Sequence, residues 1–183
     1  MGRARFDAIV IGTGQAGPAL ADRLAKHGMR VAVIERGRFG GTCVNTGCIP
    51  TKTLVASAAV ARTAQRAAEY GVMLGGPLRI DMQRVKARKD EVSGRSSQGV
   101  ERWMTGNERI TVHRGHARFT GPRSVEVNGE TLEAERIFIN VGGRPSSRGV
   151  EGADTTPHYT SSSIMNVDFV PEHLVIVGGS YIG

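Results

Sequence analysis

The sequence predicts an α/β fold built around a parallel sheet, and three observations predict it. A short apolar run at residues 6–11 is followed at once by the glycine-rich stretch GTGQAG at residues 12–17. Residues 18–27 then repeat apolar side chains at helical spacing. A second apolar run at residues 30–34 ends in Glu35. Strand, glycine turn, helix and strand in this order are typical of parallel strands joined by a crossover helix.

The glycine-rich stretch has the spacing of a dinucleotide-binding turn. Gly12 permits a tight turn, Gly14 lets the backbone approach a pyrophosphate, and Gly17 lets the helix pack closely on the strand. The amino end of the helix would attract phosphates, and Glu35 would accept hydrogen bonds from ribose hydroxyls. We therefore predict a Rossmann-like site, in which Glu35 alone does not distinguish NAD from FAD. A glycine turn without a ligand is the alternative.

Composition and charge narrow the class of partner. The chain has 183 residues and a formal net charge of +7. This charge raises the possibility of nucleic-acid binding, but the basic residues are scattered and the aromatic ones are few. The sequence holds no apolar stretch with the length of a signal peptide or a membrane span. We therefore expect a cytoplasmic protein whose partners include neither nucleic acid nor a membrane.

Both cysteines of the chain, Cys43 and Cys48, lie in the stretch GGTCVNTGCIPTK at residues 40–52. A regular helix places residues at this spacing about 7.5 Å apart along its axis, whereas a disulfide needs Cα atoms within roughly 4.4–6.8 Å. A bridge therefore requires a distorted turn, which Gly47 and Pro50 suit. Spacing alone leaves two readings open: a redox-active pair, or two buried, inert thiols. A zinc site is disfavoured because further ligands are missing nearby.

The stretch after the cysteines favours redox chemistry. A helix is predicted over residues 51–69 with Pro50 at its first position, so that Cys48 would lie near a helix end that favours a thiolate. A redox-active disulfide needs an electron source beside it, and a flavin passes two electrons to a disulfide. At the first nucleotide site, the cysteine pair therefore favours FAD over NAD.

Further elements are predicted along the rest of the chain. A second helix is expected over residues 82–104. Residues 110–119 and 124–127 are predicted to form strands of a small antiparallel insertion, with Gly-Pro and Asn-Gly turns after them. A last strand is predicted over residues 170–177, before a second glycine-rich loop.

These features together resemble the class I pyridine nucleotide-disulfide oxidoreductases, which include dihydrolipoamide dehydrogenase, glutathione reductase and mercuric reductase. The resemblance rests on the first glycine turn, on Glu35 and on residues 41–52. It implies that Cys48 faces the flavin as the charge-transfer thiolate, and that Cys43 is the interchange cysteine that meets the substrate. The residues that it assigns to FAD here are Gly12, Gly14, Gly17, Glu35, Gly41, Thr42, Cys43, Cys48 and Lys52, with Lys52 beside the reactive N5 edge.

Two later segments also resemble FAD-contacting parts of this family. The backbone around Ala117 resembles the strand that meets the adenine. Val141, Gly142 and Gly143 resemble the glycine turn that returns the chain to FAD. Val141 stands where a threonine is common, which puts a side-chain hydrogen bond at that point in doubt.

The last residues resemble the loop that receives NADH or NADPH. Its positions are Gly178, Ser180 and Gly183, with Ser180 where a glycine is usual. Tyr181 resembles the tyrosine that covers the flavin, and a plain core tyrosine is the alternative. The catalytic set implied by the resemblance is thus Cys43, Cys48, Lys52 and Tyr181.

The resemblance implies an FAD-binding domain at residues 1–149 and the beginning of an NAD(P)H-binding domain at residues 150–183. Because the chain ends inside the second glycine loop, we expect a fragment of a longer, homodimeric flavoenzyme. NAD(P)H would reduce FAD, FAD would reduce the cystine, and Cys43 would act on a small-molecule disulfide or on Hg(II). A mercuric reductase-like enzyme is favoured over a dihydrolipoamide dehydrogenase or glutathione reductase-like one. An inactive FAD-binding module is the non-enzyme alternative.

Overall fold

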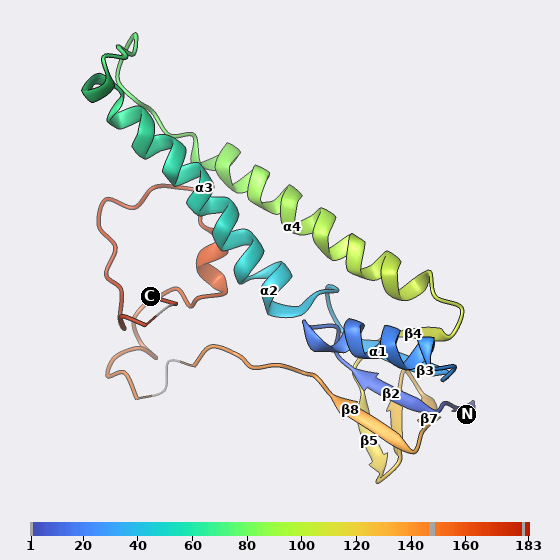
Figure 1. Ribbon diagram of the computed structural model, residues 1–183. Helices are drawn as coiled ribbons and strands as arrows, with labels where there is room; N and C mark the ends of the chain where they lie inside the picture. Colours follow the sequence, from blue (N-terminus) through green and yellow to red (C-terminus); the bar gives the residue numbers. More distant parts are fainter. Residues whose placement is uncertain (1, 147–148, 181) are drawn as a thin grey trace. The chain divides into compact units, whose positions relative to one another are not determined.

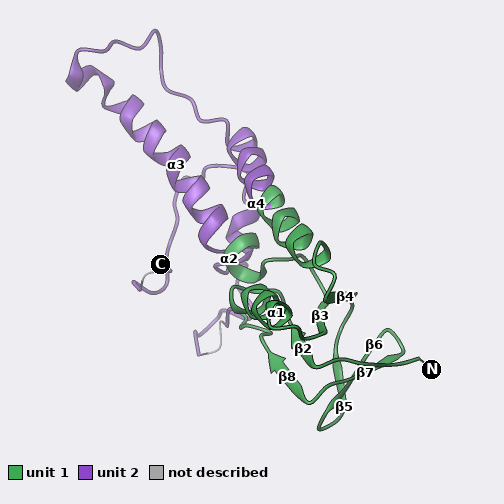
Figure 2. Ribbon diagram, turned by 45° about the vertical axis from the view of Figure 1, so that its right-hand side comes forward, with its two compact units in different colours: residues 1–45, 94–144 green, residues 46–93, 145–183 purple. Residues whose placement is uncertain are grey.

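The computed structural model describes residues 2–146, 149–180 and 182–183. It divides into two compact units (Figure 2). Unit 1 comprises residues 1–45 and 94–144, and unit 2 comprises residues 46–93 and 145–183. This division follows compactness alone, so the domain boundary expected at residues 149–150 stays a prediction.

Unit 1 is built on a parallel sheet of four strands, in the order β4 (Ile110–Arg114), β3 (Val31–Glu35), β2 (Ala8–Ile11) and β8 (Arg136–Ile139). The helix α1 (Ala16–Lys26) connects β2 to β3 and lies against this sheet (Figure 1). The strands and the helix predicted within residues 6–34 are therefore confirmed, with shifts of one or two residues at their ends.

A second sheet contains β1 (Arg3–Arg5), β7 (Glu130–Glu133), β6 (Ser124–Val127) and β5 (Arg118–Gly121), in that order. β5, β6 and β7 are antiparallel, whereas β1 joins β7 in parallel. The prediction that residues 110–119 belong to the insertion is wrong for its first half. Ile110 is buried beside Val31, which places β4 in the parallel sheet, because an apolar side chain there covers the same core as β3.

The parallel sheet buries both of its faces because successive side chains of a strand point to opposite sides. Ile9 and Ile34 face a core that is shared with the antiparallel sheet, and Val10 and Val33 face a core that is shared with α1. The first core consists of Phe6, Ile9, Ile11, Ala32, Ile34, Val125, Val127, Leu132 and Ala134. The second consists of Val10, Ala21, Ala25, Val31, Val33, Phe39, Met104 and Ile110. Full burial on both faces explains the continuous apolar runs of the sequence.

Two longer helices follow the short helix α2 (Gly41–Asn45): α3 (Cys48–Gln65), followed by the 3₁₀ turn η1 (Ala67–Tyr70), and α4 (Met82–Thr105). The helix predicted at residues 82–104 is confirmed. α3 begins two residues before Pro50, and Thr51 N donates to Gly47 O at 3.0 Å. The prediction that Pro50 occupies the first position is therefore wrong. Pro50 is tolerated at the third position because backbone N–H groups of the first turn lack partners within the helix.

Unit 2 contains no strand among its described residues, so the strand predicted at residues 170–177 is wrong. Val175 and Val177 are 74% and 76% exposed. A strand needs a paired neighbour to satisfy its backbone and to cover its side chains, and this segment has none in the described part of the chain. The turn η2 (Ser163–Asn166) precedes it.

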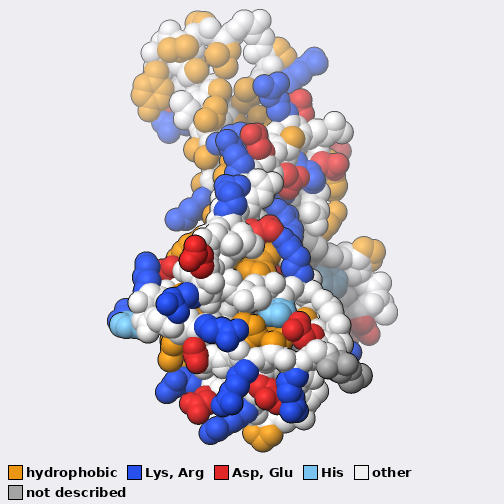
Figure 3. Space-filling model, turned by 90° about the vertical axis from the view of Figure 1, so that its right-hand side faces the viewer, with side chains coloured by type: hydrophobic (Ala, Val, Ile, Leu, Met, Phe, Trp, Pro, Cys, Tyr) orange, Lys and Arg blue, Asp and Glu red, His pale blue; other side chains and the backbone are white. Residues whose placement is uncertain are grey.

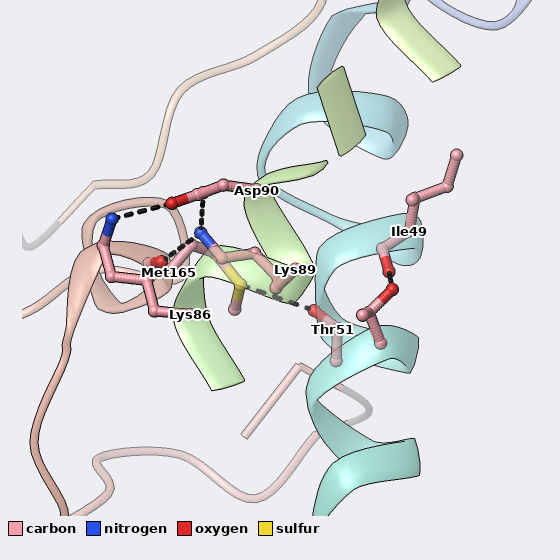
Figure 4. A network of polar contacts seen from close by, with 7 residues as sticks. Ile49, Thr51, Lys86, Lys89, Asp90 and Met165 are labelled. Carbon is pink, nitrogen blue, oxygen red and sulfur yellow. Dashed lines mark hydrogen bonds and ion pairs between the residues drawn. The ribbon is translucent and has the colours of Figure 1, made fainter. Parts of the chain in front are cut away.

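A polar network in unit 2 ties η2 to α4 (Figure 4). The side chain of Lys89 is 4% exposed; it donates to Met165 O at 2.7 Å and pairs with Asp90. Lys86 pairs with the other oxygen of Asp90 at 2.7 Å. The Oγ1–H of Thr51 points at Met165 Sδ, 3.9 Å away. The buried ammonium group of Lys89 thus holds η2 against α4.

The surface mixes charges of both signs. On the face shown in Figure 3, basic and acidic side chains are interspersed. Several large apolar side chains of unit 2 are exposed, among them Val60, Tyr70 and Met73. No helix in the described part of the chain has both the length and the apolar character required to cross a membrane.

Candidate functional site

The first glycine turn is too crowded for side chains. Gly12 has φ +100°, and a Cβ on it would lie 2.3 Å from Asn140 O. A Cβ on Gly17 would lie 2.2 Å from Gly12 O. Within the turn, Gly17 N donates to Gly14 O at 3.1 Å. The turn therefore brings bare backbone to the start of α1, where the N–H groups of the first helical turn attract anionic groups.

The segment that leads into α2 closes on the same turn. Gly41 has φ +61°, and a Cβ on it would lie 2.7 Å from Gly14 Cα. Gly40 N donates to Thr13 O at 3.1 Å and to Thr13 Oγ1 at 3.2 Å. The backbones of the two glycine-bearing segments are thus in direct contact. The glycines of this cradle, Gly12, Gly14, Gly17 and Gly41, let the backbones approach one another and leave backbone rather than side chains at the start of α1.

Glu35 is fixed at the carboxyl end of β3. Its Oε2 accepts hydrogen bonds from Thr13 N at 2.9 Å and from Thr13 Oγ1 at 2.6 Å. Its Oε1 accepts from Gly37 N at 2.8 Å. Each carboxylate oxygen accepts about two hydrogen bonds, so Oε1 keeps capacity for a hydroxyl of a bound ribose. The cradle and this acid fit an adenine dinucleotide such as FAD.

Ala117 lies beyond β4, on a segment that is tied to Glu35. Gly115 N donates to Glu35 O at 2.9 Å, and Arg36 lies 3.4 Å from His116 through Nη1 and Nδ1. Ala117 itself is half-buried against the core shared by the two sheets. The predicted adenine-contacting segment and the predicted ribose acid therefore belong to one neighbourhood.

Val141, Gly142 and Gly143 directly follow β8 and Asn140. Val141 is exposed, and Gly142 adopts φ +66°. Asn140 N donates to Ile11 O at 2.8 Å, and Asn140 Nδ2 donates to Gly12 O at 3.3 Å. The segment thus returns the chain to the first glycine turn.

The residues around the cysteines are divided between the two units. Thr42 and Cys43 lie on α2 in unit 1, and Cys43 is half-buried. Cys48, the first residue of α3, and Lys52 are exposed and belong to unit 2. Among the residues that the structure describes, no three His, Cys, Asp or Glu side chains gather as ligands of a metal ion would.

At its described residues, the second glycine loop has a backbone similar to that of the first. Gly178 has φ +104°, and a Cβ on Gly183 would lie 2.2 Å from Gly178 O. Gly183 N donates to Ser180 O at 3.0 Å, so that Ser180 takes the place of Gly14. Tyr181 lies outside the described residues.

Three residues support this site although the sequence motifs do not predict their roles: Thr13, Asn45 and Asn140. Thr13 is fully buried and joins Glu35 to Gly40. Asn45 and Asn140 donate through their side-chain amides to backbone carbonyls of the two glycine segments. The only sequence signal for Thr13 and Asn140 is a polar residue at the carboxyl end of an apolar run, where parallel sheets place their ligands; Asn45 carries no such signal.

Comparison with known proteins agrees with this geometry. The family model of pyridine nucleotide-disulphide oxidoreductases matches residues 6–183. A dihydrolipoyl dehydrogenase of Chlorobaculum parvum is 39% identical, with 98% of this chain and 39% of that protein covered. A mercuric reductase of Lysinibacillus sphaericus is 29% identical, with 97% and 32% covered.

A solved structure resembles the fold. The HOCl-induced flavoprotein disulfide reductase RclA from Escherichia coli is 37% identical, with a TM-score of 0.78 over 96% of this chain and 37% of that chain. The chain thus spans less than two fifths of the length of these relatives. Members of the matched family are flavin-dependent oxidoreductases that generally use FAD and NAD(P)H. This chain belongs to the pyridine nucleotide-disulphide oxidoreductase family.

Proposed function

We propose that the protein is an FAD-dependent, NAD(P)H-linked disulfide oxidoreductase in which Cys43 and Cys48 form the redox pair. The contact between Gly41 and Gly14 supports this most strongly, because it joins the helix of Cys43 to the turn that would hold the cofactor. FAD would be held by the first glycine turn and by Glu35, and would supply two-electron transfer from a nicotinamide. The second glycine loop would receive NADH or NADPH.

The cysteines would carry the chemistry toward the substrate. The Cys43 thiolate attacks one sulfur of a substrate disulfide, which forms a mixed disulfide and releases one substrate thiol. The Cys48 thiolate then attacks the Cys43 sulfur, which forms the cystine and releases the second thiol. The order of attack follows the roles that the family resemblance assigns to the two cysteines.

The substrate would be a small disulfide, with a soft metal ion as the second candidate. The dihydrolipoyl dehydrogenase at 39% identity favours a dithiol or disulfide substrate. The mercuric reductase favours Hg(II), and a Cu(II) complex of the disulfide reductase RclA adds Cu(II) to the ions to be tested. The stretch Val44-Asn45-Thr46 and Ser180 also resemble mercuric reductases. A cytoplasmic homodimer remains part of the proposal.

An anaerobic titration tests this proposal. The full-length protein is purified, its FAD content is measured, and NADH or NADPH is added while spectra are recorded. We expect a long-wavelength charge-transfer band that disappears in Cys48→Ser and persists in the control variant Asp22→Asn, which neutralises the partner of Lys26 on α1 and leaves both cysteines in place. Bound FAD without this band would contradict the role of Cys48. Turnover with lipoamide, Hg(II) and Cu(II) then separates the substrates.

A further inference from the structure

Asn45, the last residue of α2, holds the turn that precedes its own helix. Its Nδ2 donates to Phe39 O and to Gly41 O, each at 2.9 Å. Phe39 O accepts a further hydrogen bond from Ser97 Oγ at 2.8 Å. A helix of 5 residues closes very few backbone hydrogen bonds. The side chain of Asn45 therefore supplies donors that so short a helix lacks.

The turn from Phe39 to Gly41 is confined on both sides. A Cβ on Gly40 would lie 2.5 Å from a methyl group of Val44, and one on Gly41 would meet Gly14. Thr13 binds Gly40 N from the side of the glycine turn. Asn45 binds the flanking carbonyls from the side of α2. The turn is thus the joint between the nucleotide cradle and the helix of Cys43.

The amide of Asn45 carries a cost that packing alone does not explain. Its Oδ1 is buried and has no hydrogen-bond partner among the described residues. A buried acceptor without a donor destabilises the folded state, because it has lost its hydrogen bonds to water. An apolar side chain would avoid this cost but would leave the carbonyls of Phe39 and Gly41 without the amide donor. The useful part of Asn45 is therefore its donor group.

We propose that Asn45 is a positioning residue for Cys43. By clamping the carbonyls of Phe39 and Gly41, it fixes α2 on the nucleotide cradle and thereby sets the reactivity of the Cys43 thiol. Cys43 lies midway between Gly41 and Asn45, so loss of the clamp frees the turn of helix that carries the sulfur. This inference rests on the proposed function, in which Cys43 attacks the substrate.

The effect should be selective, because other side chains hold the nucleotide. Glu35 and Thr13 contact each other without Asn45. A small displacement of a reacting group costs on the order of 10²-fold in rate. We therefore expect loss of the clamp to slow attack by Cys43 more than it weakens binding of FAD.

The test compares Asn45→Ala and Asn45→Asp with Asn107→Asp in the full-length, FAD-loaded protein. Asn45→Asp keeps the shape and removes the donor, and Asn45→Ala removes the donor without adding charge. Asn107→Asp removes an amide donor outside the cradle, at a half-buried loop residue whose side-chain oxygen accepts from Arg109 N and whose side chain also bonds Asp22. In the dithiol form, the alkylation of each cysteine by iodoacetamide is followed by mass spectrometry. The kcat and KM for a disulfide substrate and the FAD content are measured for each variant.

Both Asn45 variants should change the alkylation rate of Cys43 by about tenfold or more and lower kcat, while the FAD content stays the same. The control Asn107→Asp should change neither the alkylation rate of Cys43 nor kcat. If both variants melt earlier but keep the Cys43 rate within about twofold, Asn45 only stabilises the fold and the inference is wrong. If Asn45→Ala does not fold, the isosteric Asn45→Asp decides alone. Cys43→Ser separates the two hypotheses: full disulfide reduction without this thiol would overturn the proposed function itself.

Discussion

The two glycine loops have nearly the same backbone in very different surroundings. Gly12 and Gly178 have φ values of +100° and +104°, and in each loop a Cβ on the last glycine would lie 2.2 Å from the first glycine's carbonyl. A Cβ on Gly12 would also collide with Asn140 O, whereas one on Gly178 would meet nothing within 4 Å. The turn is therefore a local property of the glycine spacing, and the cradle is a property of the packed sheet.

The same contrast separates the two units. In unit 1, Ile9, Val10, Val31 and Val33 are fully buried, and Glu35 is anchored by three hydrogen bonds. In unit 2, the apolar run at residues 170–177 stays exposed and η2 is held by Lys89. Apolar burial stabilises the first unit, whereas a few polar contacts hold the tail of the second.

The largest expected effect compares Gly12→Ala with Gly178→Ala. The first substitution adds a clash with the backbone at Asn140 to a strained φ, so we expect a loss of about 3 kcal/mol or more in unfolding free energy and no retained FAD. The second adds only the strain of a positive φ, about 1–2 kcal/mol. Denaturant unfolding and FAD content after gel filtration measure both. Equal losses would show that the first loop gains nothing from its packing.

A smaller effect is expected for Glu35→Gln. The amide nitrogen of glutamine cannot accept a hydrogen bond, so either Thr13 or Gly37 loses its acceptor. The ribose hydroxyl would also lose a negatively charged acceptor. Hydrogen bonds to charged groups contribute about 1.5–3 kcal/mol, which corresponds to roughly 10–150-fold in the Kd of FAD. Quenching of flavin fluorescence measures this Kd. An unchanged Kd, with Glu130→Gln as the surface control, would remove Glu35 from the ribose site.

In unit 2, Lys89→Met should release η2 from α4. The substitution keeps the apolar stem but leaves Met165 O without its donor, at a cost of about 1–3 kcal/mol. Hydrogen exchange of residues 163–167 should accelerate, while exchange of β2 and β3 stays slow. Lys86→Met, at a more exposed partner of the same carboxylate, is the matched control and should accelerate exchange less.

The smallest expected effect is the pH dependence of that network. Burial alone would raise the pKa of Asp90, but hydrogen bonds and charges from Lys86 and Lys89 outweigh it and hold the pKa below the usual 3.8. A lowered pKa means that this stabilisation is present above pH 3.8 and is lost as the pH falls through the folded-state value.

Hydrogen exchange of residues 163–167 between about pH 6 and pH 2.5, corrected for intrinsic rates, measures this loss. Asp90→Asn should remove the step, whereas the same change at the exposed Asp154 should preserve it. A step at the same pH in Asp90→Asn would assign the titration to another group.

Much of the parallel sheet and its helices is predictable from the sequence pattern. β2, α1, β3 and α4 followed from runs of apolar residues and their period, because these patterns reflect burial on one or both faces. The sequence predicts a strand at residues 110–114 but not its sheet, because apolar alternation does not reveal which neighbour a strand pairs with. The predictions for Pro50 and for residues 170–177 fail for a related reason. The start of a helix depends on which backbone N–H groups find partners, and a strand forms only beside another strand that pairs with it.

The glycine spacing is enough to set the two glycine turns, since φ near +100° and the close approach to a carbonyl recur in both loops although their surroundings differ. The sequence also provides the two thiols available for redox chemistry, those of Cys43 and Cys48. The contacts of Thr13 and Asn140 with the first loop, and of Asn45 with the turn before α2, depend on tertiary structure, because each side chain acts on a carbonyl, a carboxylate or an N–H group that folding brings to it. A local pattern sets backbone conformation, whereas the partners of a buried polar group depend on the packed chain.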